Sequence, residues 1–123
     1  VADYRPKQVF DEKVKKQDKE MSIELKKTDD ILKYLGEHRT PQQFLCGFSM
    51  ETQNMIGNSR AKLGKKHLDM VAANNLKVAG AGFQGDTNVL TLITQDEEVS
   101  LPLMSKEDAA LKILDKILTL TSF

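Results

Sequence analysis

The sequence has 123 residues and a mass of 13.8 kDa, and its 40% hydrophobic residues suit one domain with one modest core. Its 18 basic and 18 acidic residues cancel, which excludes a global field that would draw the chain to nucleic acid or to an anionic membrane. The single cysteine, Cys46, excludes an internal disulfide and a cysteine zinc site, and no apolar run reaches the ~20 residues of a membrane span. We therefore expect a cytoplasmic protein in which any phosphate recognition is local.

The N-terminal third predicts a strand end, a loop, a strand and a helix. Residues 1–6 look like the tail of a buried strand, so we expect a fragment of a larger domain, and a small domain with a trimmed N-terminus is the alternative. Residues 7–19 follow Pro6, are polar and carry five lysines, which is typical of a mobile loop. Residues 21–27 alternate as a half-buried strand does. Thr28, Asp29 and Asp30 then favour the start of a helix that runs through Leu35 and ends within residues 36–41.

Residues 44–75 predict a central strand, helix and strand. An apolar run, Phe44-Leu-Cys-Gly, precedes a polar turn and a helix-like segment, and residues 68–75 read as the second strand. The helical segment carries four basic residues, Arg60, Lys62, Lys65 and Lys66. In an open α/β sheet the ligand binds at the carboxyl ends of the strands, so positive charge beside that loop indicates a phosphorylated ligand.

The C-terminal part predicts a hairpin and a closing helix. Residues 77–88 are rich in small residues and are expected to form a loop, and residues 89–94 and 98–103 flank a turn, which gives an antiparallel hairpin over residues 87–103. Ser105 begins a capping box before a helix over residues 109–120. Five of its apolar residues are expected to face inward: Leu111, Ile113, Leu114, Ile117 and Leu118. The predicted fold class is α/β, an open, mostly parallel, Rossmann-like sheet with helices on both faces and an appended hairpin.

Six segments in one order resemble a known family. They are Val1-Ala-Asp-Tyr-Arg-Pro, Lys13-Val-Lys-Lys, Leu25-Lys-Lys-Thr-Asp-Asp-Ile-Leu, Gly47-Phe-Ser-Met-Glu-Thr, Lys62 with Lys66-His-Leu-Asp-Met-Val-Ala-Ala-Asn, and Gly82-Phe with Asp86 and Asn88. The chain resembles the phosphopantothenate–cysteine ligase domain, which in many bacteria is the C-terminal part of a bifunctional flavoprotein of coenzyme A biosynthesis. The resemblance covers essentially the whole chain.

This resemblance implies a ligation in two steps. CTP and Mg²⁺ convert the carboxylate of 4′-phosphopantothenate into an acyl-cytidylate, and the amino group of cysteine then displaces CMP. It also implies a homodimer, a missing N-terminal half of the domain with a glycine-rich phosphate-binding stretch, and FMN only in a fused decarboxylase domain outside this chain. We therefore expect residues 1–123 alone to be inactive. A non-catalytic nucleotide-binding or assembly module of the same fold is the alternative.

The resemblance also assigns site residues. Lys13 is the implied catalytic residue, in a flap over residues 7–19 that closes on the reacting groups and where a lysine can stabilise the phosphorus transition state. The implied CTP contacts are Asp3, Lys13, Asp29, Asp30, Ile31, Leu32, Phe48, Lys62 and Lys66. The resemblance assigns no magnesium ligands.

Each of these residues has a plainer interpretation. Lys62 and Lys66 are four apart, with no acid between residues 51 and 69, but they also suit a solvated helix face. Lys13 is one lysine among several in its loop, Phe48 suits a core position, and Asp3 suits a turn before Pro6. Asn74 could serve a site or a turn. Cys46 and His67 are expected to be an inert buried thiol and a surface imidazole, because neither has activating neighbours in the sequence.

Overall fold

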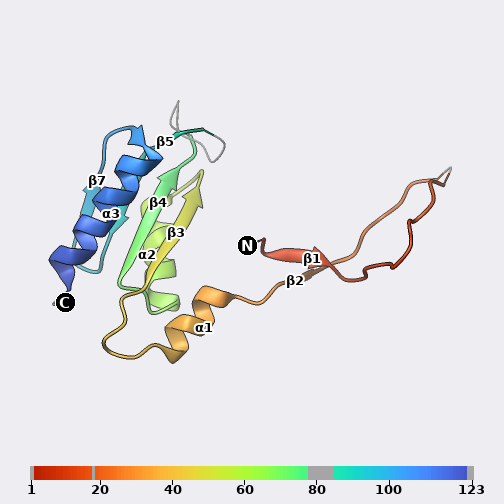
Figure 1. Ribbon diagram of the computed structural model, residues 1–123, viewed down its shortest axis with the longest axis horizontal. Helices are drawn as coiled ribbons and strands as arrows, with labels where there is room; N and C mark the ends of the chain where they lie inside the picture. The colour runs from red at the N-terminus through yellow and green to blue at the C-terminus, as the bar shows by residue number, and fades with distance from the viewer. Residues whose placement is uncertain (1, 18, 78–84, 122–123) are drawn as a thin grey trace. The chain divides into compact units, whose positions relative to one another are not determined.

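The computed structural model describes residues 2–17, 19–77 and 85–121. By its internal contacts the chain forms two compact units, Val1–Ile31 and Leu32–Phe123 (Figure 1). The boundary between them falls at the first residue of helix α1.

The first unit is an antiparallel ribbon. Strand β1 (Tyr4–Pro6) pairs with β2 (Leu25–Lys27), and the Thr28 N–H donates to the Asp3 carbonyl oxygen at 2.9 Å. Every residue of both strands is exposed. The predicted half-buried strand over residues 21–27 is therefore wrong, since only its last three residues are a strand and an alternating pattern is buried only where another layer covers one face. The predicted buried strand end over residues 1–6 is likewise exposed from residue 2 onward, and residue 1 lies outside the described chain.

The second unit is built on a mixed sheet. Its strands are β3 (Cys46–Glu51), β4 (Met70–Asn75), β6 (Leu90–Ile93) and β7 (Glu98–Ser100), in the order β3-β4-β6-β7. β3 and β4 are parallel, whereas β4–β6 and β6–β7 are antiparallel. The strand, helix and strand over residues 44–75 and the hairpin are confirmed, but the described sheet is not mostly parallel. The hairpin is not appended to the sheet: β6 lies against β4, and all four of its residues are buried.

Helices cover both faces of this sheet, as predicted. They are α1 (Ile31–His38), α2 (Met55–Lys65) and α3 (Lys106–Leu120) (Figure 1). Successive residues of a strand point to opposite faces, so Met70 and Ala72 of β4 share one core with α3. Val71 and Ala73 share the other core with α2, and Leu32 of α1 packs against that second core.

Helix α3 begins directly after its cap, three residues earlier than the predicted start at residue 109. The Asp108 N–H donates to Ser105 Oγ at 3.0 Å, and the helix starts at Lys106. Just before it, β8 (Met104–Ser105) pairs with β5 (Thr87–Asn88), which lies at the end of the expected loop; residues 78–84 of that loop, including the Gly82-Phe motif, lie outside the described residues.

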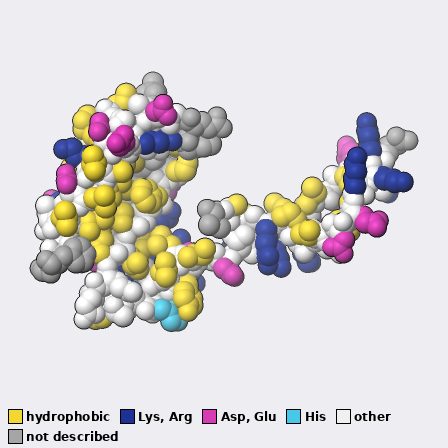
Figure 2. All heavy atoms as spheres, in the orientation of Figure 1, with side chains coloured by type: hydrophobic (Ala, Val, Ile, Leu, Met, Phe, Trp, Pro, Cys, Tyr) yellow, Lys and Arg dark blue, Asp and Glu magenta, His cyan; other side chains and the backbone are white. Residues whose placement is uncertain are grey.

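The predicted inward face of α3 is too wide. Ile113 is buried and Ile117 half-buried, but Leu111, Leu114 and Leu118 are 55%, 56% and 61% exposed. Ala109, Ile113 and Ile117 are spaced four apart, and this narrow stripe is the one that packs on the sheet. Figure 2 shows hydrophobic side chains on the surface of this unit.

Candidate functional site

A hydrogen-bonded carboxylate closes the carboxyl end of β3. Glu51 Oε1 accepts from Ser49 Oγ at 2.7 Å, and Glu51 Oε2 accepts from Asn58 Nδ2 at 3.3 Å. The Ser59 hydroxyl lies 3.4 Å from that of Ser49, and both serines are buried. These contacts tie the end of β3 to the first turns of α2, where a negative charge also suits the helix dipole. Sequence reasoning missed this network, although Ser49 and Glu51 are two apart on one strand and so share a face.

Lys62 and Lys66 lie at the other end of α2. The helix starts after the carboxyl end of β3 and returns to the amino end of β4. Lys62 is in its last turn and Lys66 is its C-cap residue. A rise of 1.5 Å per residue puts Lys62 about 10 Å along the axis from the start of the helix. The prediction that these cations flank the loop after β3 is therefore wrong, because the direction of the helix carries them away from it.

The structure instead brings Lys66, the C-cap residue of α2, beside α1. Leu32 packs against the core that holds Leu63 and Leu68. A Cβ on Gly36 of α1 would lie 1.8 Å from the Lys66 carbonyl oxygen, so these backbones are in direct contact. Three predicted nucleotide contacts, Leu32, Lys62 and Lys66, thus come from two adjoining elements of one unit.

Phe48 is 66% exposed, so the alternative that it is a core aromatic is wrong for this chain. On β3, Gly47 faces the α1 and α2 side, where a Cβ would lie 2.8 Å from both Leu32 Cδ2 and Leu68 Cδ1. Because strand residues alternate, Phe48 points to the opposite face. The structure therefore does not bring Phe48 together with Lys62 and Lys66 on one side of the sheet.

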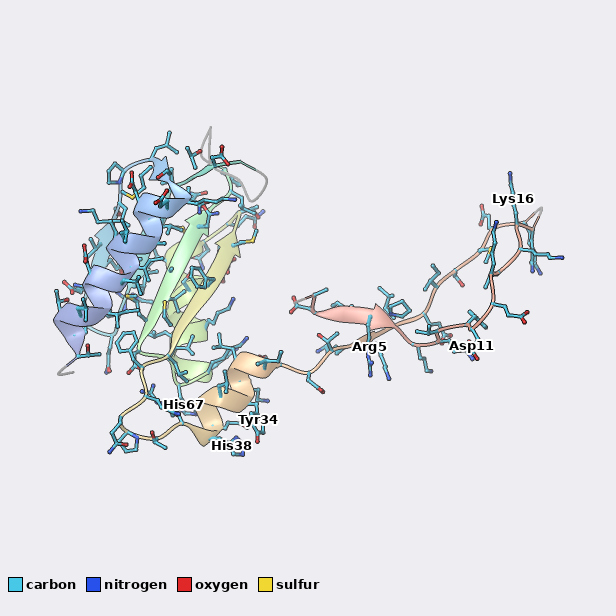
Figure 3. The ribbon with its side chains drawn as sticks, in the orientation of Figure 1. Arg5, Asp11, Lys16, Tyr34, His38 and His67 are labelled. Atoms are coloured by element: carbon cyan, nitrogen blue, oxygen red, sulfur yellow. The ribbon has the colours of Figure 1, made fainter. Side chains whose placement is uncertain are left out.

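The remaining predicted contacts belong to the unit Val1–Ile31. They are Asp3, Lys13, Asp29, Asp30 and Ile31, and all are exposed. Lys13 lies in a segment that has no helix or strand over residues 7–17, and Figure 3 shows Asp11 and Lys16 in the same segment. The nucleotide contacts of these residues, and the closure of this segment as a flap, stay predictions.

Asn74 is a buried residue of β4 and is only 8% exposed, so the turn interpretation is wrong. Its Nδ2 donates to Asn88 Oδ1 at 3.3 Å. Its own Oδ1 is buried and has no hydrogen-bond partner within the described ranges. This amide therefore links the end of β4 to β5.

Cys46 is a half-buried thiol at the start of β3, and burial raises its pKa to about 11. It lines a hollow of about 460 Å³ together with Leu35, Gln42, Gln43, Phe44, Leu45 and Ile117. His67 is exposed and has a φ of 53°, in the left-handed region. Both observations agree with the expectation of an inert thiol and a surface imidazole.

The raised pKa of Cys46 predicts slow alkylation. At pH 8 we expect iodoacetamide to modify the folded chain about 100-fold more slowly than the unfolded chain, because the pKa rises from 9.0 to about 11 and the thiolate is the nucleophile. The unfolded thiol also ionises first as the pH rises above 9.0, so folding stability should fall between pH 9.0 and about 11. Mass spectrometry of timed alkylation with and without urea measures the first effect, and equal rates would contradict it.

The side chains of the described residues do not form a metal site by themselves. No group of three or more His, Cys, Asp or Glu side chains in residues 2–17, 19–77 and 85–121 could hold a metal ion. No helix in this part of the chain is long and apolar enough to cross a membrane.

Comparisons with known proteins identify the family. The protein family described as "DNA/pantothenate metabolism flavoprotein C-terminal domain" matches residues 1–120 of this chain. The chain is 49% identical over 122 residues to the coenzyme A biosynthesis bifunctional protein CoaBC of Bacillus subtilis, and 37% identical over 122 residues to that of Escherichia coli. These matches cover 98% and 97% of this chain but 30% of each relative.

A solved structure agrees with this match. The C-terminal domain of a CoaBC protein superposes with a TM-score of 0.73 at 36% identity, covering 98% of this chain and 50% of that one. The chain thus spans less than a third of the length of these curated relatives and half of the solved domain. It belongs to the DNA/pantothenate metabolism flavoprotein C-terminal domain family.

Proposed function

We propose that this chain is the C-terminal portion of a phosphopantothenate–cysteine ligase domain that uses CTP. The observation that carries the proposal is the match over 98% of the chain to the solved C-terminal domain of a CoaBC protein. The Rossmann-like arrangement and the assignment as a portion of a larger domain belong to the same proposal. The assignment as a portion is supported by the 50% coverage of that solved domain and by β3, which is an edge strand of the described sheet. The Rossmann-like arrangement is supported by the parallel pair of β3 and β4, which α2 connects.

The proposed reaction makes and then breaks a mixed anhydride. The carboxylate oxygen of 4′-phosphopantothenate attacks the α-phosphorus of CTP, and pyrophosphate leaves with the electrons of the broken P–O bond. The amino nitrogen of cysteine then attacks the acyl carbon, loses a proton, and displaces CMP to leave an amide. Because a carboxylate is a poor electrophile, the protein's task is to hold two polyanions in line and to offset charge on the phosphorus oxygens.

Within this proposal the chain supplies cations and backbone contacts to CTP. Lys62 and Lys66 at the end of α2 bind phosphate oxygens, next to the α1 segment that contains Leu32. In the same proposal Asp3, Asp29, Asp30 and Ile31 contact CTP and Lys13 stabilises the pentacoordinate phosphorus. Phe48 is left out of these contacts, because it lies on the opposite face of the sheet from Lys62 and Lys66.

In this proposal magnesium arrives with the triphosphate. Mg²⁺ commonly uses substrate phosphates and waters with few protein ligands, and the described residues offer no cluster of their own. FMN belongs to the decarboxylase domain of the bifunctional protein, outside this chain. A homodimer is also part of the proposal, with the β7 edge of the hairpin as a candidate contact.

The test is pyrophosphate release from CTP by the intact protein that contains this chain. Release that requires 4′-phosphopantothenate supports the ligase, whereas nucleotide binding without release would support the non-catalytic module. Lys62→Ala and Lys66→Ala should each raise the KM for CTP about tenfold, since each removes a charged contact to phosphate. Lys65→Ala is the matched control from the same turn and should leave that KM within about twofold. An equal rise in the KM for CTP in all three variants would contradict specific contacts from Lys62 and Lys66, because it would show that only the total positive charge of this turn affects CTP binding.

A further inference from the structure

The side chain of Arg39 joins two loops at the amino ends of β3 and β4. Its Nη1 lies 2.7 Å from Asp69 Oδ2 and donates to the His67 carbonyl oxygen at 3.0 Å. Its Nη2 donates to the carbonyl oxygen of Gln43. The side chains of Arg39 and Asp69 are only 20% and 33% exposed. A guanidinium suits this position because its planar fork can serve several acceptors at once.

Asp69, in the loop before β4, also binds the loop before β3. Its Oδ2 accepts the N–H of Leu45 at 2.8 Å, and its backbone N–H donates to the Leu45 carbonyl oxygen at 2.9 Å. One carboxylate therefore holds both the guanidinium and the residue just before β3. We call the ion pair of Arg39 and Asp69 the Arg39 clamp.

The Arg39 clamp holds the backbone next to Lys66. The carbonyl that Arg39 binds belongs to His67, the residue with a φ of 53°, and this loop lies beside α1 in Figure 3. The Lys66 carbonyl group, one residue earlier, lies in direct contact with Gly36 of α1. The Lys66 N–H in turn donates to the Lys62 carbonyl oxygen at 3.0 Å. The C-cap of α2 is thus fixed between α1 and the guanidinium.

We infer that the Arg39 clamp positions Lys66 for binding the phosphates of a nucleoside triphosphate. This inference rests on the proposed function of Lys62 and Lys66. A left-handed residue and a helix end would otherwise have several backbone conformations available, and a cation displaced by about 1 Å can lose much of its effect on a bound polyanion. Arg39 and Asp69 are positioning residues, since they act through the backbone that carries Lys66.

A matched control for the Arg39 clamp is the ion pair of Arg60 and Glu98, because Arg60 lies on α2, the helix whose C-cap residue is Lys66. Arg60 Nη2 lies 2.7 Å from Glu98 Oε1, and Arg60 Nη1 donates to the Thr94 carbonyl oxygen at 3.1 Å. This pair also combines a guanidinium with one carboxylate and a backbone carbonyl. It ties α2 to the turn between β6 and β7, not to the C-cap of α2.

The experiment compares Asp69→Asn and Arg39→Met with Glu98→Gln and Arg60→Met in the intact protein. We expect the two clamp variants to raise the KM for CTP about tenfold while the KM for cysteine changes less than about twofold. The control variants should leave both KM values within about twofold of those of the unsubstituted protein. This should hold even where their unfolding midpoints fall as far as those of the clamp variants. Asp69→Asn keeps the shape and an acceptor for the Leu45 N–H, so it remains measurable if Arg39→Met does not fold.

A double-substitution cycle separates positioning from general loss of structure. If the Arg39 clamp acts through Lys66, then Asp69→Asn should have little further effect on the KM for CTP in a Lys66→Ala background. Additive effects, or an unchanged KM in both clamp variants, would overturn the inference. Failure of the proposed function looks different, because the unsubstituted protein would then release no pyrophosphate from CTP.

Discussion

Lys13→Gln should lower pyrophosphate release from CTP by about 100- to 1,000-fold in the intact protein, the range seen when one preorganised electrostatic contact to a transition state is removed. Glutamine keeps a similar length and can still donate a hydrogen bond, but it carries no charge to offset the oxygens of a pentacoordinate phosphorus. The affinity for CTP should fall by a much smaller factor than the rate of pyrophosphate release, because the proposed contact strengthens in the transition state.

The fold should tolerate this change. Lys13 is exposed and lies where residues 7–17 have no helix or strand, so its substitution removes no core packing. Lys19→Gln is the control, since Lys19 is an exposed lysine of the same polar stretch that has no assigned role. Circular dichroism and pyrophosphate release are measured for both variants. Release by Lys13→Gln at the rate of Lys19→Gln would remove Lys13 from the mechanism.

Gly36→Ala should destabilise the fold by about 3 kcal/mol, at the upper end of the usual cost of overpacking. The added Cβ would lie 1.8 Å from the Lys66 carbonyl oxygen and 2.8 Å from its carbonyl carbon. Both sides of this contact are backbone, so no side chain can rotate away. Either α1 or the loop after α2 must move, and the hydrogen bond from Arg39 to the His67 carbonyl would be strained with it.

Gly64→Ala is the matched control for this prediction. A Cβ on Gly64 meets nothing within 4 Å, and the residue lies inside α2. Alanine there should stabilise the fold by about 0.5–1 kcal/mol, because glycine is a poor helix residue. Denaturant unfolding gives both values when the slopes agree. Equal midpoints for Gly36→Ala and the unsubstituted protein would show that α1 does not pack on Lys66 in solution.

The sequence alone determined the features that depend on nearby residues. The cap at Ser105, the helix after Asp30, the hairpin turn and the strand, helix and strand over residues 44–75 each follow from residues within a few positions of one another. The resemblance in six ordered segments also led to the family that the comparisons show. Capping and periodicity act locally, so they can be read before the chain is folded.

Only the tertiary structure decided which elements are neighbours. It inserted β6 beside β4 and so made the sheet mixed, and it left Leu111, Leu114 and Leu118 exposed, because an apolar residue is buried only where another layer covers it. It placed Lys62 in the last turn of α2, away from the loop after β3 that its charge was expected to flank, and it paired Arg39 with Asp69, 30 positions away. Such long-range contacts leave no local pattern, since their free energy depends on the relative placement of whole elements.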